Sequence, residues 1–195
     1  MNTRRVVIDY GHGGSKPGAV YGGVEEKTVN LFTGQELYHE LHKHDEGQDI
    51  QVMLTRDSDY DIPISVRCQL INQHHERQPI GLVISVHYNA VGDPSVSGFE
   101  VYYLASSVKG LAAAREVLRV VQQAGIPVRG QGLITTAQLG RRLAMIHKTK
   151  PPAILIEVGY LTNVLDRNNA QDPSFRTNVA RAVAKGIRAY LEKEG

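Results

Sequence analysis

The chain has 195 residues, and its 22 Lys and Arg against 20 Asp and Glu leave a net charge of +2. This small charge, without a dense basic stripe, argues against nucleic acid as a partner. The one cysteine, Cys68, excludes an intrachain disulfide framework and a cysteine-rich zinc module. The length and the hydrophobic content of 42% are typical of a globular domain, so we expect a single domain over residues 1–195.

The start of the sequence shows no export signal. Its first apolar run, residues 6–8, is broken by Asp9, whereas a signal peptide needs about 7–15 apolar residues. The sequence has no apolar run of about 18 residues either, so we expect no membrane span. The alternative that a leader has been removed stays open.

Apolar runs and helical patterns alternate along the chain. Short β-branched runs favour buried strands, and apolar residues repeating every three or four positions favour helices. In chain order these patterns predict a strand at 6–8, a helix at 27–44, a strand at 50–54, a helix at 63–77, strands at 82–86 and 99–104, a helix at 107–124, a strand at 153–158 and a helix at 174–193. The glycine-rich residues 125–140 are predicted as a loop. The alternation predicts an α/β fold with a mostly parallel sheet flanked by helices.

Polar residues stand where several predicted strands end. His12 follows the first strand, His87 closes the run 82–87, and Glu157 closes the run 153–157. Glu26 lies between a glycine-rich turn and the first helix. In open parallel sheets, sites form beyond the carboxyl ends of the strands. Two histidines and a carboxylate can hold Zn²⁺ with one position open, and a second carboxylate can then move protons.

Each of these residues also has a plain structural interpretation. A single histidine after a strand is more often a hydrogen-bonded structural residue than a ligand. Glu26 could be a first-turn carboxylate that the helix dipole stabilises. Glu157 fits a structural role least well, because a carboxylate at the end of an apolar strand is costly to bury without a partner.

Other chemistries fit the sequence poorly. The run Gly11-His12-Gly13-Gly14 lacks the lysine and hydroxyl of a phosphate-binding loop and does not complete a dinucleotide fingerprint. A Gly-x-Ser-x-Gly elbow of a serine hydrolase is absent from the sequence.

Six stretches in a fixed order carry a resemblance to a known enzyme family. They are residues 7–14 with 17–19, 26–31, 54–57 with Arg67 and Asn72, 85–90, 98–103, and 152–163. Through them nearly the whole chain resembles the zinc-dependent N-acetylmuramoyl-L-alanine amidases, which cleave the bond between muramic acid and the stem peptide of peptidoglycan. Each stretch is weak evidence by itself, but all six in order are a specific signal.

The resemblance implies a central sheet of about six strands and one zinc ion per chain. It makes His12, Glu26 and His87 the zinc ligands and Glu157 the catalytic carboxylate. Arg67 and Asn89 are expected to bind substrate or to support the ligands. The water that attacks the amide would lose a proton to Glu157, which would return it to the leaving amine.

Three positions depart from the family pattern or leave it ambiguous. Tyr10 stands where the family usually has proline, and Tyr88 replaces a smaller residue that we expect beside the metal site. Glu25 precedes Glu26, so the ligand could shift by one position. We prefer Glu26 because it directly precedes the Lys-x-x-Asn-Leu run.

The biological setting is less constrained. The chain fits a phage or prophage endolysin made in the cytoplasm and released onto the cell wall, and it equally fits a fragment of an exported enzyme. We expect a monomer that binds peptidoglycan. We also expect an unregulated site, because the 50 residues before the last strand leave little space for an inhibitory helix. The alternatives are another zinc-dependent amide hydrolase or carboxypeptidase, and a wall-binding module without catalysis. Ser15, three positions after His12, disfavours a His-x-x-Glu carboxypeptidase site.

Overall fold

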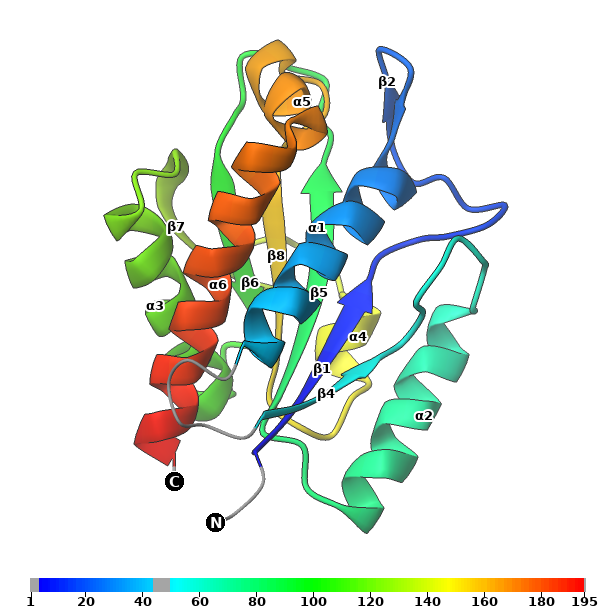
Figure 1. The fold of residues 1–195 in the computed structure, drawn as a ribbon, viewed down its shortest axis with the longest axis vertical. Coiled ribbons are helices and arrows are strands. Elements are labelled where there is room, and N and C mark those ends of the chain that lie inside the picture. The colour runs from blue at the N-terminus through cyan, green and yellow to red at the C-terminus, as the bar shows by residue number, and fades with distance from the viewer. Residues whose placement is uncertain (1–3, 44–49, 195) are drawn as a thin grey trace.

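The computed structural model of the chain describes residues 4–43 and 50–194. Within these residues, six strands form one sheet in the order β4-β1-β5-β8-β6-β7 (Figure 1). Their bounds are Arg4–Tyr10 for β1, Ile50–Leu54 for β4, Leu82–Asn89 for β5, Phe99–Tyr103 for β6, Val128–Thr135 for β7 and Ala153–Tyr160 for β8. Neighbouring strands are parallel except β6 and β8, which are antiparallel. The mostly parallel sheet predicted from the sequence is therefore confirmed.

Helices cover both faces of this sheet (Figure 1). On one face α6 packs between α1 and α3, and on the other α2 packs against the one-turn α4. The helix bounds are Glu26–His42 for α1, Ile64–Arg77 for α2, Val108–Gln123 for α3, Ala144–His147 for α4, Val164–Gln171 for α5 and Pro173–Glu194 for α6. None of these described helices is both long enough and apolar enough to cross a bilayer.

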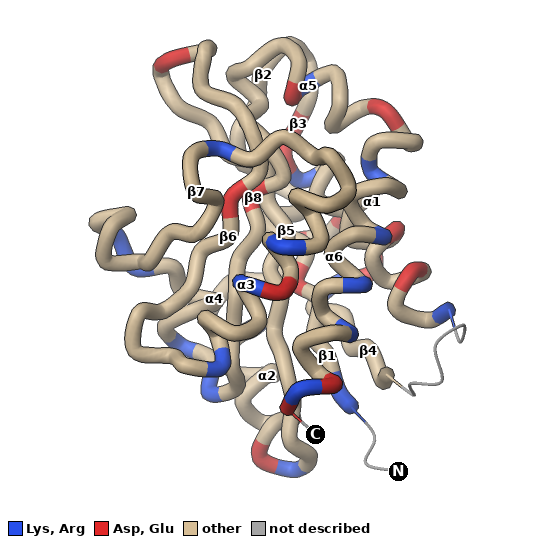
Figure 2. The backbone as a smooth tube through the Cα atoms, turned by 90° about the vertical axis from the view of Figure 1, so that its left-hand side faces the viewer, with Lys and Arg blue, Asp and Glu red and all other residues tan. Residues whose placement is uncertain are grey.

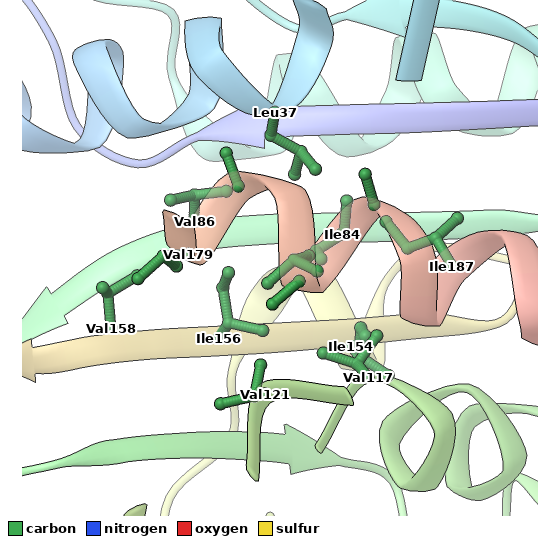
Figure 3. Close-up of a cluster of buried hydrophobic side chains, with 14 of the residues drawn as sticks. Leu37, Ile84, Val86, Val117, Val121, Ile154, Ile156, Val158, Val179 and Ile187 are labelled. Carbon is green, nitrogen blue, oxygen red and sulfur yellow. The ribbon is translucent and has the colours of Figure 1, made fainter. Parts of the chain in front are cut away.

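The larger core lies between the sheet and helices α1, α3 and α6 (Figure 3). Buried side chains from alternate strand positions meet side chains spaced along the helices, among them Ile84, Val86, Ile154 and Ile156 against Leu37, Val117, Val121, Val179 and Ile187. Because side chains alternate along a strand, the residues between these apolar positions point to the opposite face. Asp9, Ser85, His87 and Glu157 lie at such positions and near the carboxyl ends of their strands.

The predicted strands and helices all appear, with shifts of a few residues at their ends; residue 44 of the first predicted helix lies outside the described residues. The loop predicted at 125–140 is wrong in part, because β7 lies within it. β7 is an edge strand with exposed residues and with Gly130 and Gly132 at positive φ, so it lacks an apolar alternation. The predicted elements do not include α4, α5 or the short hairpin of β2 (Val20–Tyr21) and β3 (Val24–Glu25).

Candidate active site

Three side chains converge beyond the carboxyl ends of β1 and β5. His12 lies in the loop after β1, Glu26 is the first residue of α1, and His87 is near the end of β5. His12 Nε2 lies 3.1 Å from Glu26 Oε2, and His87 Nδ1 lies 2.8 Å from Glu26 Oε1. One ligand atom from each residue can be chosen so that all lie within 4.8 Å of one another. The structure therefore brings together the three ligands expected from the sequence.

This donor set suits a zinc ion. Zinc bonds of about 2.0–2.1 Å in a tetrahedron place neighbouring ligand atoms about 3.3 Å apart, close to the separations between the glutamate and the two imidazoles. The charge is suitable too, because two neutral imidazoles and one carboxylate leave part of the 2+ charge to polarise a further ligand. Both imidazoles are partly exposed, with side-chain exposures of 33% for His12 and 18% for His87, so one side of the cluster is open to a substrate.

The side chain of Glu26 is ionised, and that of its neighbour Glu25 lies away from the two histidines. Burial raises the pKa of Glu26, but hydrogen bonds with the two histidines outweigh burial and hold the pKa well below its usual range. The backbone N–H of Ala19 donates a further bond of 2.9 Å to Glu26 Oε2. The more exposed Glu25 faces Lys27 instead, 3.5 Å from its Nζ. Of the two glutamates, the structure brings Glu26 to the histidines.

Glu157 lies on β8 directly across from His87 in the strand register. Its side chain is buried, and its Oε2 atom has no hydrogen-bond partner within the described residues. Burial raises the pKa of Glu157 well above its usual range, the charge of Glu26 raises it further, and Arg141 lowers it in part. A carboxyl group with high proton affinity and one free oxygen thus stands beside the histidine–glutamate cluster.

A family model described as N-acetylmuramoyl-L-alanine amidase matches residues 6–189. The chain belongs to this amidase family. Its structure is similar to AmiC2 of Nostoc punctiforme, with a TM-score of 0.82, 34% identity and 97% of both chains covered. It is also similar to the amidase from Clostridium difficile 630, with a TM-score of 0.87, 26% identity and both chains fully covered. The family predicted from the sequence motifs is therefore confirmed.

Two curated relatives are also named as N-acetylmuramoyl-L-alanine amidases, and both are longer than this chain. The germination-specific amidase of Bacillus subtilis is 29% identical over 213 residues, which cover 100% of this chain and 83% of that protein. AmiC of Neisseria meningitidis is 29% identical over 231 residues, and the match covers 97% of this chain but 54% of that protein. The chain thus spans about half the length of the Neisseria relative.

The chain carries a second buried carboxylate beside Glu157, which was not among the predicted site residues. Glu100 on β6 is the register partner of Glu157 on β8. Figure 2 shows acidic segments of the backbone in red beside the β6 and β8 labels. Glu100 accepts hydrogen bonds from the hydroxyls of Tyr102, at 2.8 Å, and of Tyr160, and from Arg129 Nη1 at 2.7 Å. Every oxygen of this carboxylate is therefore used, in contrast to the free oxygen of Glu157. The one available signal was an acidic residue inside an apolar strand, as at Glu157.

Asn89, expected to bind substrate or support the ligands, joins this second cluster. Its Nδ2 donates to Tyr102 Oη at 3.3 Å, and its Oδ1 accepts from the backbone N–H of Ala90. The register between β5 and β8 shifts after His87, so that Asn89 pairs with Tyr160. The shift turns Tyr160 towards Glu100, which a strict two-residue period would not have predicted.

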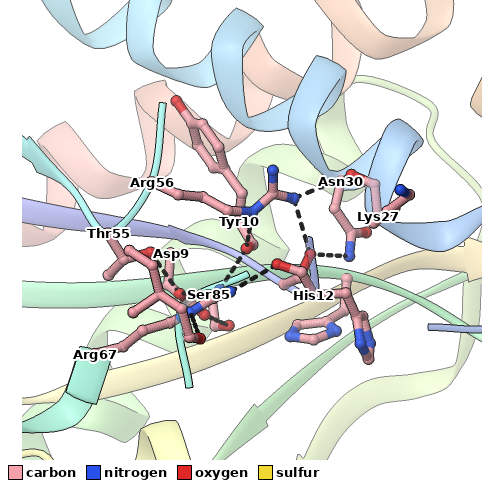
Figure 4. A network of polar contacts seen from close by, with 12 residues as sticks. Asp9, Tyr10, His12, Lys27, Asn30, Thr55, Arg56, Arg67 and Ser85 are labelled. Atoms are coloured by element: carbon pink, nitrogen blue, oxygen red, sulfur yellow. Dashed lines mark hydrogen bonds and ion pairs between the residues drawn. The ribbon is translucent and has the colours of Figure 1, made fainter. Parts of the chain in front are cut away.

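Arg67, given the same expectation, is 3% exposed and is occupied by other groups of the chain (Figure 4). It forms an ion pair of 3.0 Å with Asp9 and donates to the carbonyl oxygens of Ile62, Tyr10 and His12. These contacts favour support of the ligands over contact with substrate.

The two tyrosines that depart from the family pattern both pack under α1. The ring of Tyr10 lies against Gly34, where a Cβ atom would come within 2.1 Å of a ring carbon. The hydroxyl of Tyr88 lies 3.0 Å from Thr33 Oγ1 in the larger core. The expectation that Tyr88 lies beside the metal site is therefore wrong, because its side chain points to the face of β5 opposite His87.

A cavity of about 540 Å³ opens beside His12 and His87. Its walls come from the start of α2, the start of α4 and β8, and its apolar lining includes Ile62, Pro63, Ile64, Leu143, Met145 and Leu155. Between β6 and β8 the described elements are α3, β7 and α4, and none of them fills this cavity. The expectation of an unregulated site stays a prediction.

Proposed function

We propose that the chain hydrolyses the amide bond between N-acetylmuramic acid and L-alanine in peptidoglycan. The observation that carries the proposal is the placement of Glu157, with its free buried oxygen, across the strand register from His87 of the histidine–glutamate cluster. Family membership supports the choice of bond.

In this proposal His12, Glu26 and His87 hold one zinc ion. When bound, zinc supplies Lewis acidity, which polarises the scissile carbonyl and lowers the pKa of a water molecule. The low pKa of Glu26 keeps it ionised as a ligand at neutral pH. The backbone N–H of Ala19 and the side chain of Asn30 orient its two oxygens from behind.

Glu157 moves the proton. Its free Oε2 accepts a proton from the attacking water as the C–O bond forms, and the same group then protonates the departing amine of L-alanine as the C–N bond breaks. A carboxyl group suits both steps better when its pKa is raised above its ordinary value, and burial and the charge of Glu26 raise the pKa of Glu157 here. The apolar cavity beside the histidines gives the groups flanking the amide a place to bind.

The test is digestion of purified peptidoglycan, with mass analysis of the products. We expect new L-alanine N-termini paired with free lactyl groups, loss of the reaction on chelation and its return with added zinc. Glu157→Gln should retain zinc but lose hydrolysis, whereas His87→Ala should lose zinc. Release of a C-terminal residue would indicate a carboxypeptidase instead, and unchanged walls with zinc-loaded protein would indicate a binding module.

A further inference from the structure

Two buried arginines lie under the loop that carries His12 (Figure 4). Arg56 is 1% exposed and donates from Nε to the carbonyl oxygen of Tyr10 at 2.9 Å and from Nη2 to that of Gly11 at 3.0 Å. Arg67 donates from Nη1 to the carbonyl oxygen of Tyr10 and from Nη2 to that of His12, both at 2.7 Å. Three successive carbonyl groups are therefore bound by two guanidinium groups.

The backbone of His12 needs such support. Its φ of +62° lies in the left-handed region, which is unfavourable for a residue with a Cβ atom. The turn directs successive carbonyl groups into the protein, where a buried acceptor without a donor is costly. The arginines supply these donors, so the strained conformation of His12 depends on them.

Arg56 also joins this loop to the helix that carries Glu26. Its Nη2 donates to the carbonyl oxygen of Lys27 at 3.0 Å as well as to that of Gly11. Asn30, one turn along α1 from Glu26, donates to the same Gly11 oxygen at 3.1 Å. The separation of His12 and Glu26 is thereby fixed from behind.

Arg67 joins the loop to the strand that carries His87. Its partner Asp9 accepts 2.6 Å hydrogen bonds from Ser85 and from Thr55. Ser85 lies two residues before His87, on the same face of β5. Burial raises the pKa of Asp9, but Arg67 and the two hydroxyl groups outweigh burial and keep it below the usual range, so the pair is ionised.

We propose that Arg56 and Arg67 are positioning residues that hold His12, Glu26 and His87 in the mutual placement a bound cation requires. This inference rests on the proposed function only in assuming that a cation binds His12, Glu26 and His87. It assumes nothing about the amide bond. Its readout is metal affinity, so it can fail while hydrolysis by the parent protein stands.

Arg188 provides a matched control. It is a buried arginine whose Nη2 likewise donates to backbone carbonyl groups, those of Glu40, Leu41 and Lys43, at the end of α1 away from the site. Replacing any of these arginines with methionine removes donors from buried carbonyl groups and should destabilise the fold. Arg56 and Arg67 differ from Arg188 in being next to the ligand loop.

The experiment measures zinc affinity by competition with a chromophoric chelator for the parent chain, R56M, R67M, R56K, R67K and R188M. Loss of groups that orient ligands typically weakens metal binding about 10- to 100-fold, which we expect for R56M and R67M, with R188M within about twofold of the parent. R56K and R67K should recover part of the affinity, because an ammonium can reach some of the carbonyl groups but cannot fork between them. The visible spectrum of the cobalt-substituted protein should change in R56M and R67M and stay unchanged in R188M.

Parent-like affinity in R56M and R67M, or an equal loss in R188M, would overturn the inference. If the methionine variants do not fold, the lysine variants decide the question: parent-like affinity and cobalt spectra in both would overturn it, and weakened affinity in folded protein would support it. A parent chain that binds no zinc would instead contradict the proposed function.

Discussion

Replacing Glu157 with glutamine separates its chemical role from its structural cost. The substitution keeps the shape of the side chain and removes the ionisable group. General acid–base catalysis by a positioned side chain contributes typically 10²- to 10⁴-fold to a rate, so we expect kcat for amide hydrolysis to fall by about that factor. Zinc affinity should stay within a few-fold of the parent, because Glu157 is not one of the three clustered ligands.

The same substitution should stabilise the metal-free protein at neutral and alkaline pH. The folded pKa of Glu157 is raised well above its unfolded value, mainly by burial. The protonated carboxyl group of Glu157 therefore makes its full contribution to the free energy of unfolding below the unfolded pKa, about 4.3. That contribution is lost as the pH rises through the folded pKa. Glutamine does not ionise, so E157Q should lack this loss.

The gain comes from the charge alone, because glutamine leaves the same buried position without a partner. A buried group without a partner costs more when it is charged than when it is neutral. We therefore expect E157Q to be equal to the parent in stability near pH 4 and increasingly more stable than it as the pH rises to 8 and above. Urea unfolding of both proteins in chelator, at several pH values, measures this difference. A variant that hydrolyses peptidoglycan within tenfold of the parent, or that is less stable than the parent at pH 8, would refute this account.

Two glycine substitutions test the packing around the site. A Cβ at Gly11 would lie 2.2 Å from His87 Cε1, so G11A should displace that ring and weaken zinc binding at least tenfold in the same chelator competition. Gly92 has open space around it, so G92A should bind zinc like the parent. A Cβ at Gly34 would lie 2.1 Å from the ring of Tyr10, so G34A should destabilise the fold by about 1–3 kcal/mol. In a double-mutant cycle followed by urea unfolding, Y10L should remove most of that cost, and simple additivity would contradict the contact.

The position of the candidate site could be predicted because its residues interrupt clear patterns. His87 and Glu157 each follow a run of apolar strand residues, and parallel neighbours bring such ends together. Glu26 could be chosen over Glu25 from the residues that follow it, and the structure brings Glu26 to the histidines. The chemical roles of these residues remain predictions until metal and products are measured.

The cluster around Glu100 could not be predicted from the same patterns. It requires β7, whose glycines and exposed residues hide the strand, because β7 supplies Arg129. It also requires Tyr160, which reaches Glu100 because the register shifts between β5 and β8. An irregularity of this kind depends on how two distant strands pair, and local composition carries little information about it.

Arg56 and Arg67 show a further limit of sequence patterns. Charged residues are rarely buried without partners, so a pattern of polarity places both arginines at the surface. In the folded chain, most of their partners are backbone carbonyl groups, which have the same chemistry at every residue, so polarity does not predict these contacts. Arg67 could be expected near the ligands only through the family resemblance. The residues that bind a cation can thus be recognised from side-chain chemistry, whereas the residues that hold them apart at the right distances act through the backbone. A variant survey restricted to the four residues of the predicted chemistry would therefore miss the two arginines on which we propose that metal affinity also depends.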